Sequence, residues 1–271
     1  MRAEDLLREW APKLGRFEAR LLLADALGVR TEKLVAHPEL EVDVEKEADF
    51  RRNAQRRLSG EPYPYICGRQ EFFGRDFHVT PAALIPRPDT ELLVETALEL
   101  TKGFRVPRIL DMGTGSGCIA VTLALECRAS QVTALDVSPE ALDVARGNAA
   151  ALGASVRFLQ SSWLDAVPAG EQFDIVVSNP PYIAESSPYM KDLSHEPRGA
   201  LVSGEAGLDD LKEIIARTPA RLAPGGWLAV EHGFDQGEAC RALFSEAGFS
   251  DVKTLKDLGE NDRVTLGRMP R

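Results

Sequence analysis

The sequence predicts an α/β fold: a mostly parallel sheet whose last strand runs antiparallel, preceded by a small all-helical domain and a hairpin linker. Three observations support this prediction. Residues 1–62 show only helical periodicity, prolines interrupt residues 63–88, and strand-like and helix-like segments alternate in residues 89–271. Such alternation is typical of a parallel sheet that carries helices on both faces. The last two strand-like segments follow each other across a turn, so we expect the final strand to be antiparallel.

The N-terminal domain is predicted to consist of three helices. Apolar residues recur at helical spacing in residues 6–14, and a second apolar stripe in residues 17–27 ends at Gly28, a suitable C-cap. The third helix, residues 43–58, is more polar and carries four arginines. These are Arg51, Arg52, Arg56 and Arg57. We interpret them as a solvated face with acidic partners such as Glu47. A contact patch for an acidic or RNA-bearing partner is the alternative.

Residues 63–88 are predicted to form the linker between the two domains. Their prolines break helices, and two short strand-like runs flank Gly74-Arg75, as in a small β-hairpin. His78 lies in this strand-like alternation, so we expect it to be structural rather than catalytic.

The C-terminal domain, residues 89–271, supplies the alternating elements. Residues 84–91 are expected to open its first helix, with Asp89 or Thr90 as the N-cap. The predicted strands are residues 108–111, 131–136, 155–159, 173–178, 226–231, 251–255 and 263–266. The predicted helices are residues 118–126, 139–152, 209–222 and 236–247.

A glycine-rich loop follows the first predicted strand of the sheet. It reads Asp111-Met112-Gly113-Thr114-Gly115-Ser116-Gly117, and a helix follows it. Glycines at alternate positions let a ligand approach the backbone closely, and the helix N-terminus offers free N–H groups. The second strand ends in Asp136, 19 positions after Gly117, where an acidic residue suits a ribose diol. The alternative is a glycine-rich turn with a coincidental acid.

Two classes of cofactor bind to loops of this kind. Dinucleotide-binding proteins use the pattern G-x-G-x-x-G, whereas the third glycine comes one position earlier here. Asp111, just ahead of the loop, would repel a pyrophosphate but suits the cationic amino-acid end of S-adenosylmethionine. A second motif decides between the two classes.

The segment Asn179-Pro180-Pro181-Tyr182 follows the buried strand over residues 173–178. The prolines lack an N–H and restrict the backbone, so they form a rigid turn where open α/β sheets bind ligands. The turn offers two acceptors, the Asn179 side-chain oxygen and the Pro180 carbonyl, and the flat ring of Tyr182. Together these suit a planar –NH2 group, which favours an amino-group methyltransferase over an oxidoreductase. An ordinary strand-ending turn is the alternative.

The composition argues against a broad nucleic-acid-binding surface. The 271 residues include 32 Lys and Arg and 42 Asp and Glu, which gives a net charge of −10, whereas duplex binding depends largely on cations that neutralise phosphates. The four cysteines are scattered without a C-x-x-C pair, which predicts a reducing compartment without disulfides or a zinc site. We see neither a signal peptide nor a membrane-spanning run, so we expect a cytoplasmic protein.

These motifs resemble those of class I S-adenosylmethionine-dependent methyltransferases, which have a Rossmann-like fold. More specifically, the chain resembles the release-factor glutamine methyltransferases (PrmC, also called HemK). The resemblance rests on residues 84–91, 111–117, 178–183, 196–198, 207–209 and 231–233. The glycine loop and Asn-Pro-Pro-Tyr also occur in nucleic-acid methyltransferases, whereas Ile-Pro-Arg-Pro-Asp-Thr-Glu is the specific segment. The helical leader fits the family's N-terminal domain.

The resemblance implies transfer of a methyl group from S-adenosylmethionine to the side-chain nitrogen N5 of a glutamine. That glutamine belongs to the Gly-Gly-Gln motif of class 1 peptide-chain release factors. The implied cofactor-binding residues are Gly113, Thr114, Gly115, Ser116, Gly117, Asp136, Trp163 and Asn179, with Asp136 at the ribose and Trp163 at the adenine. Asn179, Pro180, Pro181 and Tyr182 would hold the substrate glutamine. We expect a monomer with no metal, no membrane association and no stable nucleic-acid partner, which docks the release factor through residues 1–62.

Some residues depart from the family pattern, and the sequence also leaves rival functions possible. Ser162 stands where the family often has an acid that reaches the adenine amine, and Gly199 and Ala206 also differ from the usual residues. No residue has to be a general base; Glu231 and His232 are candidates, but we expect them to shape a turn. The main rival function is methylation of adenine N6 or guanine N2 in a nucleic acid. A non-catalytic cofactor sensor and an NAD-dependent oxidoreductase are two further rivals.

Overall fold

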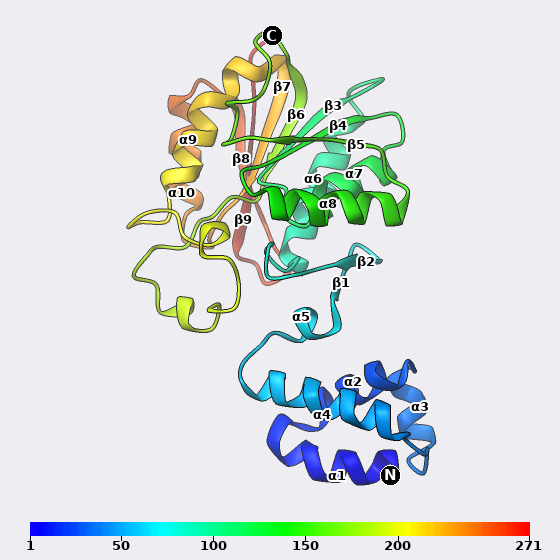
Figure 1. Ribbon diagram of the computed structural model, residues 1–271. Coiled ribbons are helices and arrows are strands. Elements are labelled where there is room, and N and C mark those ends of the chain that lie inside the picture. Colours follow the sequence, from blue (N-terminus) through cyan, green and yellow to red (C-terminus); the bar gives the residue numbers. More distant parts are fainter. The chain divides into compact units, whose positions relative to one another are not determined.

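The computed structural model describes residues 1–271 and divides the chain into two compact units, Met1–Arg69 and Gln70–Arg271 (Figure 1). The boundary between them lies within residues 63–88, the proline-rich segment. The first unit is built from helices, and the second contains a seven-stranded sheet.

Five helices pack around one core in the first unit. They are α1 (Ala3–Leu14), α2 (Arg16–Leu27), α3 (Thr31–Ala36), α4 (Val44–Leu58) and α5 (Tyr63–Cys67). Leu6, Trp10, Leu22 and Phe50 are buried, and the rings of Trp10 and Phe50 meet edge to face with their centroids 5.9 Å apart. The three predicted helices are confirmed, and Gly28 ends α2 in the left-handed conformation with φ 66°.

The two shortest helices of this unit are absent from the prediction. α3 has only 6 residues, too few for an apolar stripe to repeat. α5 corrects the expectation that the prolines after residue 62 exclude helices, because Pro62 is its N-cap and Pro64 lies in its first turn. Proline is tolerated there, since the first N–H groups of a helix have no partner within the helix.

All four arginines of α4 have acidic partners. The nitrogen–oxygen distances are 2.7 Å for Arg51–Glu9, 2.7 Å for Arg52–Asp49, 2.5 Å for Arg56–Glu61 and 2.9 Å for Arg57–Glu18. These pairs favour the interpretation of a solvated, paired face over a contact patch for an acidic partner.

A small β-hairpin follows the helices, as predicted. It consists of β1 (Arg69–Phe72) and β2 (Arg75–His78). The turn lies one residue earlier than expected, at Phe73-Gly74, where φ is 52° and 72°. Two consecutive residues with positive φ suit a two-residue hairpin turn. The backbone of His78 is held by Asn148: its N–H donates to Asn148 Oδ1 at 2.7 Å and its carbonyl accepts from Asn148 Nδ2 at 2.9 Å.

Seven strands form the sheet of the second unit. They are β3 (Arg108–Met112), β4 (Gln131–Asp136), β5 (Val156–Gln160), β6 (Phe173–Ser178), β7 (Leu222–Glu231), β8 (Ser250–Lys256) and β9 (Asp262–Arg268). Their order is β5-β4-β3-β6-β7-β9-β8, and β9 alone runs opposite to the other six strands. The predicted sheet, mostly parallel with an antiparallel last strand, is therefore confirmed.

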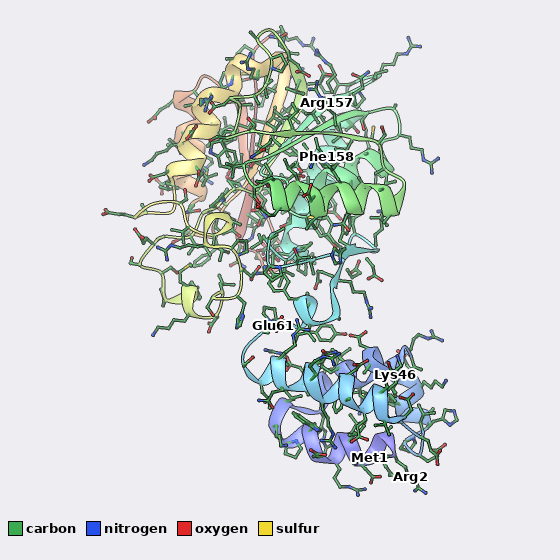
Figure 2. All side chains as sticks on the ribbon, in the orientation of Figure 1. Met1, Arg2, Lys46, Glu61, Arg157 and Phe158 are labelled. Atoms are coloured by element: carbon green, nitrogen blue, oxygen red, sulfur yellow. The ribbon has the colours of Figure 1, made fainter.

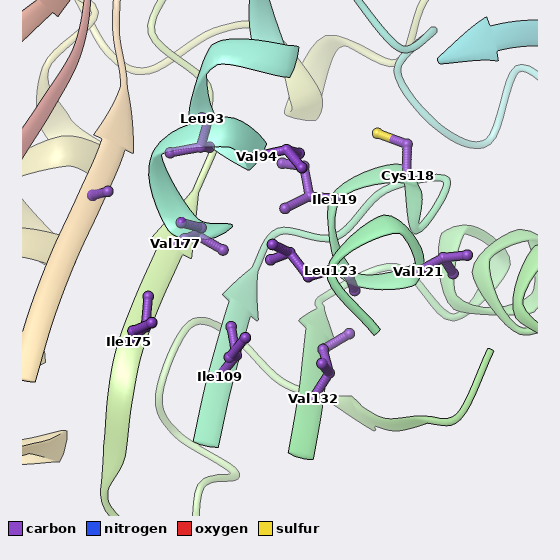
Figure 3. Packing of buried hydrophobic residues seen from close by; sticks show 14 of the residues in the cluster. Leu93, Val94, Ile109, Cys118, Ile119, Val121, Leu123, Val132, Ile175 and Val177 are labelled. Carbon is purple, nitrogen blue, oxygen red and sulfur yellow. The ribbon is translucent and has the colours of Figure 1, made fainter. Parts of the chain in front are cut away.

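Helices cover both faces of this sheet. The helical segments of this unit are η1 (Pro88–Thr90), α6 (Glu91–Thr101), α7 (Cys118–Glu126), α8 (Pro139–Leu152), η2 (Pro188–Lys191), η3 (Arg198–Ala200), α9 (Asp209–Arg217), η4 (Thr218–Arg221) and α10 (Gly237–Glu246). Alternate strand residues face different cores: Ile109 and Ile175 lie under α6 and α7 (Figure 3), and Leu110 and Val176 lie under α9 and α10.

A few boundaries differ from the prediction in small ways. The helix expected over residues 209–222 is α-helical only to Arg217, because Pro219 has no N–H to donate; η4 follows, and β7 begins at Leu222.

On the edge strand β5, Arg157 is exposed while Phe158 packs against the core under α6 and α7 (both are labelled in Figure 2). No helix combines the length and the apolar composition that crossing a membrane requires.

Candidate active site

A cavity of about 390 Å³ opens at the carboxyl ends of β3, β4, β5 and β6 in the second unit. At this edge the chain continues from β3 to β4 on one side and from β6 to β7 on the other. Such a divergence between two neighbouring parallel strands is the usual ligand site of these folds. The glycine loop forms one wall, and the turn after β6 contributes Asn179 and Pro181. Residues 82–87, Pro197, Gly199 and Ala200 also line the cavity.

The glycine loop after β3 is shaped by positive φ angles at all three glycines. Gly113, Gly115 and Gly117 have φ of 73°, 55° and 81°. Gly113, Thr114, Gly115 and Ser116 line the cavity, but Gly117 does not. A Cβ on Gly117 would lie 3.0 Å from the Cβ of Ala145, so this glycine allows α8 to pack closely. The structure thus gives Gly117 a packing role next to the predicted binding loop.

Asp111 supports the loop from below. It is fully buried, and its Oδ2 accepts a hydrogen bond from the Thr114 hydroxyl at 2.6 Å. Burial raises the pKa of its carboxyl to about 7, although the Thr114 bond lowers it. Asp111 does not line the cavity, so it reaches a ligand only through the loop that it holds.

Asp136 ends β4 and lines the cavity. Its Oδ2 accepts from the backbone N–H of Gly115 at 2.8 Å, and its Oδ1 accepts from the N–H of Ser138 at 3.0 Å. Burial raises its pKa, while these backbone bonds lower it. Each oxygen keeps a further lone pair, so the fixed carboxylate can accept from a diol in the cavity.

Asp136→Ala should weaken binding of S-adenosylmethionine, the cofactor that the sequence motifs predict for this cavity. The loss of hydrogen bonds to a charged group costs about 1.5–3 kcal/mol, which is roughly ten- to hundredfold in the dissociation constant of S-adenosylmethionine. The measurements are the dissociation constant of S-adenosylmethionine by calorimetry and the rate of methyl transfer at saturating S-adenosylmethionine. Asp136→Asn should have a milder effect, because it keeps one acceptor. A fall in the saturated rate with unchanged binding would show that Asp136 is not a donor ligand.

Trp163 lies beside the glycine loop and lines the cavity with it. Its backbone has φ 44°, a conformation that costs a non-glycine residue about 1–3 kcal/mol and often marks a functional site. The ring approaches Gly113 so closely that a Cβ there would lie 3.4 Å from Trp163 Cζ3. Ser162 beside it also lines the cavity, so this end of the cavity offers an aromatic face and a hydroxyl instead of an acid.

The turn after β6 has two free acceptors. Asn179 Nδ2 donates to the Thr90 hydroxyl at 3.0 Å, whereas no group of the chain donates to Asn179 Oδ1 or to the Pro180 carbonyl. Thr90 therefore forms a hydrogen bond with Asn179. It was one of the two predicted N-caps of α6, but its side chain makes no capping hydrogen bond there. The pair of acceptors expected from the motif is present.

Tyr182 and Pro180 do not line the cavity. The Tyr182 ring packs against the core under α9 and α10, and its hydroxyl donates to Glu231 Oε1 at 3.2 Å. Burial raises the pKa of this hydroxyl further above its ordinary value. In this arrangement the ring supports the turn and does not form a face of the cavity.

Neither candidate base lines the cavity. His232 is buried, its Nδ1 lies 2.8 Å from the carbonyl of Gly233 and its Nε2 lies 2.8 Å from the Thr265 hydroxyl. Burial lowers its pKa, which keeps the ring neutral. Glu231 is also buried and bonds Tyr182. These contacts agree with the expectation that the two residues shape their turn.

An ion pair joins two segments that wall the cavity. Arg87 Nη2 donates to Glu196 Oε1, and the backbone N–H of Ile85 donates to Glu196 Oε2 at 3.1 Å. The Glu196 side chain is 3% exposed. The two partners are 109 positions apart, so no local pattern in the sequence could have paired them.

Arg87→Met should destabilise the fold by about 2 kcal/mol, because it leaves a buried carboxylate with one backbone partner, and the partial exposure of Arg87 moderates the loss. The measurement is the free energy of unfolding from urea titration. Arg198→Met is the matched control: its pair with Glu185 is exposed on both sides, and we expect a loss below about 1 kcal/mol. Equal losses in both variants would contradict the structural role of the Arg87–Glu196 pair.

Known proteins resemble this chain in sequence and in fold. Residues 88–204 match the Methyltransferase small domain family, and residues 1–68 match the PrmC N-terminal domain family. The release factor glutamine methyltransferase of Bordetella pertussis is 49% identical over 97% of this chain and 98% of its own length. That of Burkholderia pseudomallei is 46% identical over 99% and 96%. The crystal structure of a methyltransferase from Pyrococcus furiosus shares the fold, with a TM-score of 0.55 at 19% identity over 84% of this chain and 100% of that one. The chain therefore belongs to the family of release factor glutamine methyltransferases.

Proposed function

We propose that this protein transfers a methyl group from S-adenosylmethionine to N5 of the glutamine in the Gly-Gly-Gln motif of class 1 peptide-chain release factors. The observation that carries the proposal is the pair of free acceptors, Asn179 Oδ1 and the Pro180 carbonyl, at the turn beside the cavity. The curated relatives support the substrate, since they are named release factor glutamine methyltransferases and match over nearly their whole length.

The residues around the cavity fit S-adenosylmethionine. The volume lies in the range of small-molecule sites, and Gly113 and Gly115 present backbone without side chains. Asp136 would accept from the ribose hydroxyls, and the Trp163 ring would pack on the adenine. When bound, this donor supplies a methyl group on a positively charged sulfur.

The turn after β6 would act on the glutamine amide. An amide nitrogen is a poor nucleophile, because its lone pair is delocalised into the carbonyl. Hydrogen bonds from its two N–H groups to Asn179 Oδ1 and the Pro180 carbonyl would fix its orientation and raise the electron density on nitrogen. The amide nitrogen would then form a bond to the methyl carbon while the C–S bond would break and leave its electron pair on sulfur. The nitrogen would finally release one proton to water, so positioning by Asn179 and the Pro180 carbonyl would replace a dedicated base.

Methylation of adenine N6 or guanine N2 is the rival function that needs the same acceptor pair. Two observations disfavour it: the net charge is −10, and the arginines of α4 are paired with acids. A base in a nucleic acid would also have to be flipped into the site, and the net negative charge of the protein disfavours binding of the phosphate backbone.

The proposal includes the setting of the enzyme. The four cysteines are free, which suits a reducing cytoplasm, where translation supplies the substrate. We propose that the protein is a monomer, that it docks the release factor through its helical unit, and that it keeps no nucleic acid bound.

Labelled S-adenosylmethionine tests the proposal directly. The full chain and the labelled donor are added to an extract that contains release factors and nucleic acids, and the labelled species is separated and identified by mass spectrometry. We expect the label on the glutamine of the Gly-Gly-Gln motif. Label confined to nucleic acid would establish the rival function, and donor binding without any labelled product would indicate a sensor.

A further inference from the structure

Two hydrogen bonds join the substrate turn to buried side chains of η1 and β7. Asn179 Nδ2 donates to the Thr90 hydroxyl at 3.0 Å, and the Tyr182 hydroxyl donates to Glu231 Oε1 at 3.2 Å. Thr90 is 2% exposed and Glu231 is 1% exposed. Neither residue has a part in the proposed mechanism, yet Thr90 contacts the one side chain on which that mechanism depends.

The mechanism requires Asn179 to present its oxygen, and not its NH2 group, to the substrate. A side-chain amide can bond a neighbour through either end. A threonine hydroxyl can also either donate or accept. Thr90 alone would therefore hold Asn179 equally well in the reversed orientation, with Nδ2 toward the substrate, where it would repel the N–H groups of the glutamine.

Glu231 can remove this ambiguity. Its Oε1 accepts from Tyr182, while its Oε2 is buried and has no hydrogen-bond partner. The Thr90 hydroxyl is among the groups that lower the pKa of the Glu231 carboxyl, which makes it the candidate donor to the unpartnered Oε2. An ionised carboxylate can only accept hydrogen bonds. If the single hydrogen of Thr90 goes to Glu231, the Thr90 oxygen can only accept from Asn179.

We propose that Glu231 and Thr90 are positioning residues that fix the orientation of the Asn179 amide. The Glu231 carboxylate takes the hydroxyl hydrogen of Thr90, Thr90 takes an N–H of Asn179, and Asn179 Oδ1 is left toward the substrate. This inference rests on the proposed function, because it assigns a purpose to the oxygen that binds the substrate amide.

The charge state of Glu231 connects this arrangement to pH. Burial raises the pKa of the carboxyl to about 7, while Thr90, Arg263 and Tyr182 lower it and Asp89 raises it. A protonated carboxyl can donate to Thr90, which can then donate to Asn179 and stabilise the reversed amide. The rate of methyl transfer should therefore rise with pH as Glu231 loses its proton, and fall as pH is lowered through about 7.

The first test uses full-length variants with an intact class 1 release factor as substrate. Thr90→Val keeps the shape and removes the hydroxyl, and we expect kcat to fall by roughly a hundredfold, as for a misplaced catalytic group. The dissociation constant of S-adenosylmethionine should change by less than about twofold. Thr90→Ser should restore most of kcat. Thr96→Val is the matched control, because Thr96 is buried in α6 and its hydroxyl bonds only the Leu92 carbonyl; we expect its kcat to be unchanged.

The second test asks whether Thr90 acts through Asn179. In a double-mutant cycle, Thr90→Val should add little to the loss caused by Asn179→Ala, because the group that Thr90 orients is already gone. A purely structural effect would lower kcat further in that background. Glu231→Gln should abolish the pH-dependent rise, since the amide does not titrate, and should leave a measurable rate.

The outcomes distinguish the inference from the proposed function. If the wild-type protein does not methylate the release factor, the proposed function fails. If it does, the inference is overturned by a normal kcat in Thr90→Val, by additive losses in the cycle, or by a pH-dependent rise that persists in Glu231→Gln. Loss of donor binding in Thr90→Val together with failure of Thr90→Ser to recover kcat would also overturn it, in favour of a structural role.

Discussion

Asn179→Ala should reduce methyl transfer to a release factor by about a hundred- to a thousandfold, which corresponds to about 2.7–4 kcal/mol of lost transition-state stabilisation. Asn179 Oδ1 takes no hydrogen bond from the chain, so the fold loses only the single bond from Nδ2 to Thr90. We therefore expect the variant to stay folded and to bind S-adenosylmethionine. The measurements are single-turnover methylation followed by mass spectrometry, and donor binding by calorimetry.

Asn179→Gln is the matched comparison for this prediction. It keeps the same functional groups but displaces the oxygen by one methylene, so it should lose most of the activity if position matters more than polarity. An Asn179→Ala variant with near wild-type turnover would contradict the acceptor-pair mechanism. Asn179→Ala with weak donor binding would instead assign the side chain to the donor.

The fold was predictable because its signals are local. The strands β4 and β6 and the helices α7 and α8 match their predicted bounds. The apolar pattern lies within each of these segments, and the residues that end it lie close by in the sequence. The misses are also local. α3 is too short for periodicity, and α5 uses proline at its start. The chain leaves its α-helical path next to Pro219, before the apolar pattern ends.

The candidate site was predictable only in part. The glycine loop, Asp136 and the Asn179 turn follow directly from their strands, so motif and position coincide. The partners that hold them do not: Thr90 lies 89 positions from Asn179, and Glu231 lies 49 positions from Tyr182. Such contacts depend on which strands become neighbours. Even within a motif, packing was not predictable, since the Tyr182 ring packs against a core and the backbone of Gly117 packs against α8.

Removal of residues 1–68 should strongly impair methylation of an intact release factor while leaving donor binding unchanged. This deletion ends where the match to the PrmC N-terminal domain family ends, and it keeps the β1–β2 hairpin. Every residue that lines the cavity lies between Ala82 and Asp210, and the first unit has its own core. The second unit should therefore fold and bind S-adenosylmethionine without it.

The reason to expect impairment is specificity. The acceptor pair recognises a planar amide, which any accessible glutamine carries, so the choice of a release factor needs contacts elsewhere on the enzyme. If the helical unit supplies them, its loss should lower kcat/KM for the intact factor by about a hundredfold, or about 2.8 kcal/mol. A short peptide that contains Gly-Gly-Gln is the control, because it is too small to use a distant docking surface. Full-length and truncated enzymes should methylate this peptide at equal rates. If the truncated enzyme methylates the intact factor as fast as the full chain does, the helical unit is not the docking element, and the specificity must come from the second unit alone.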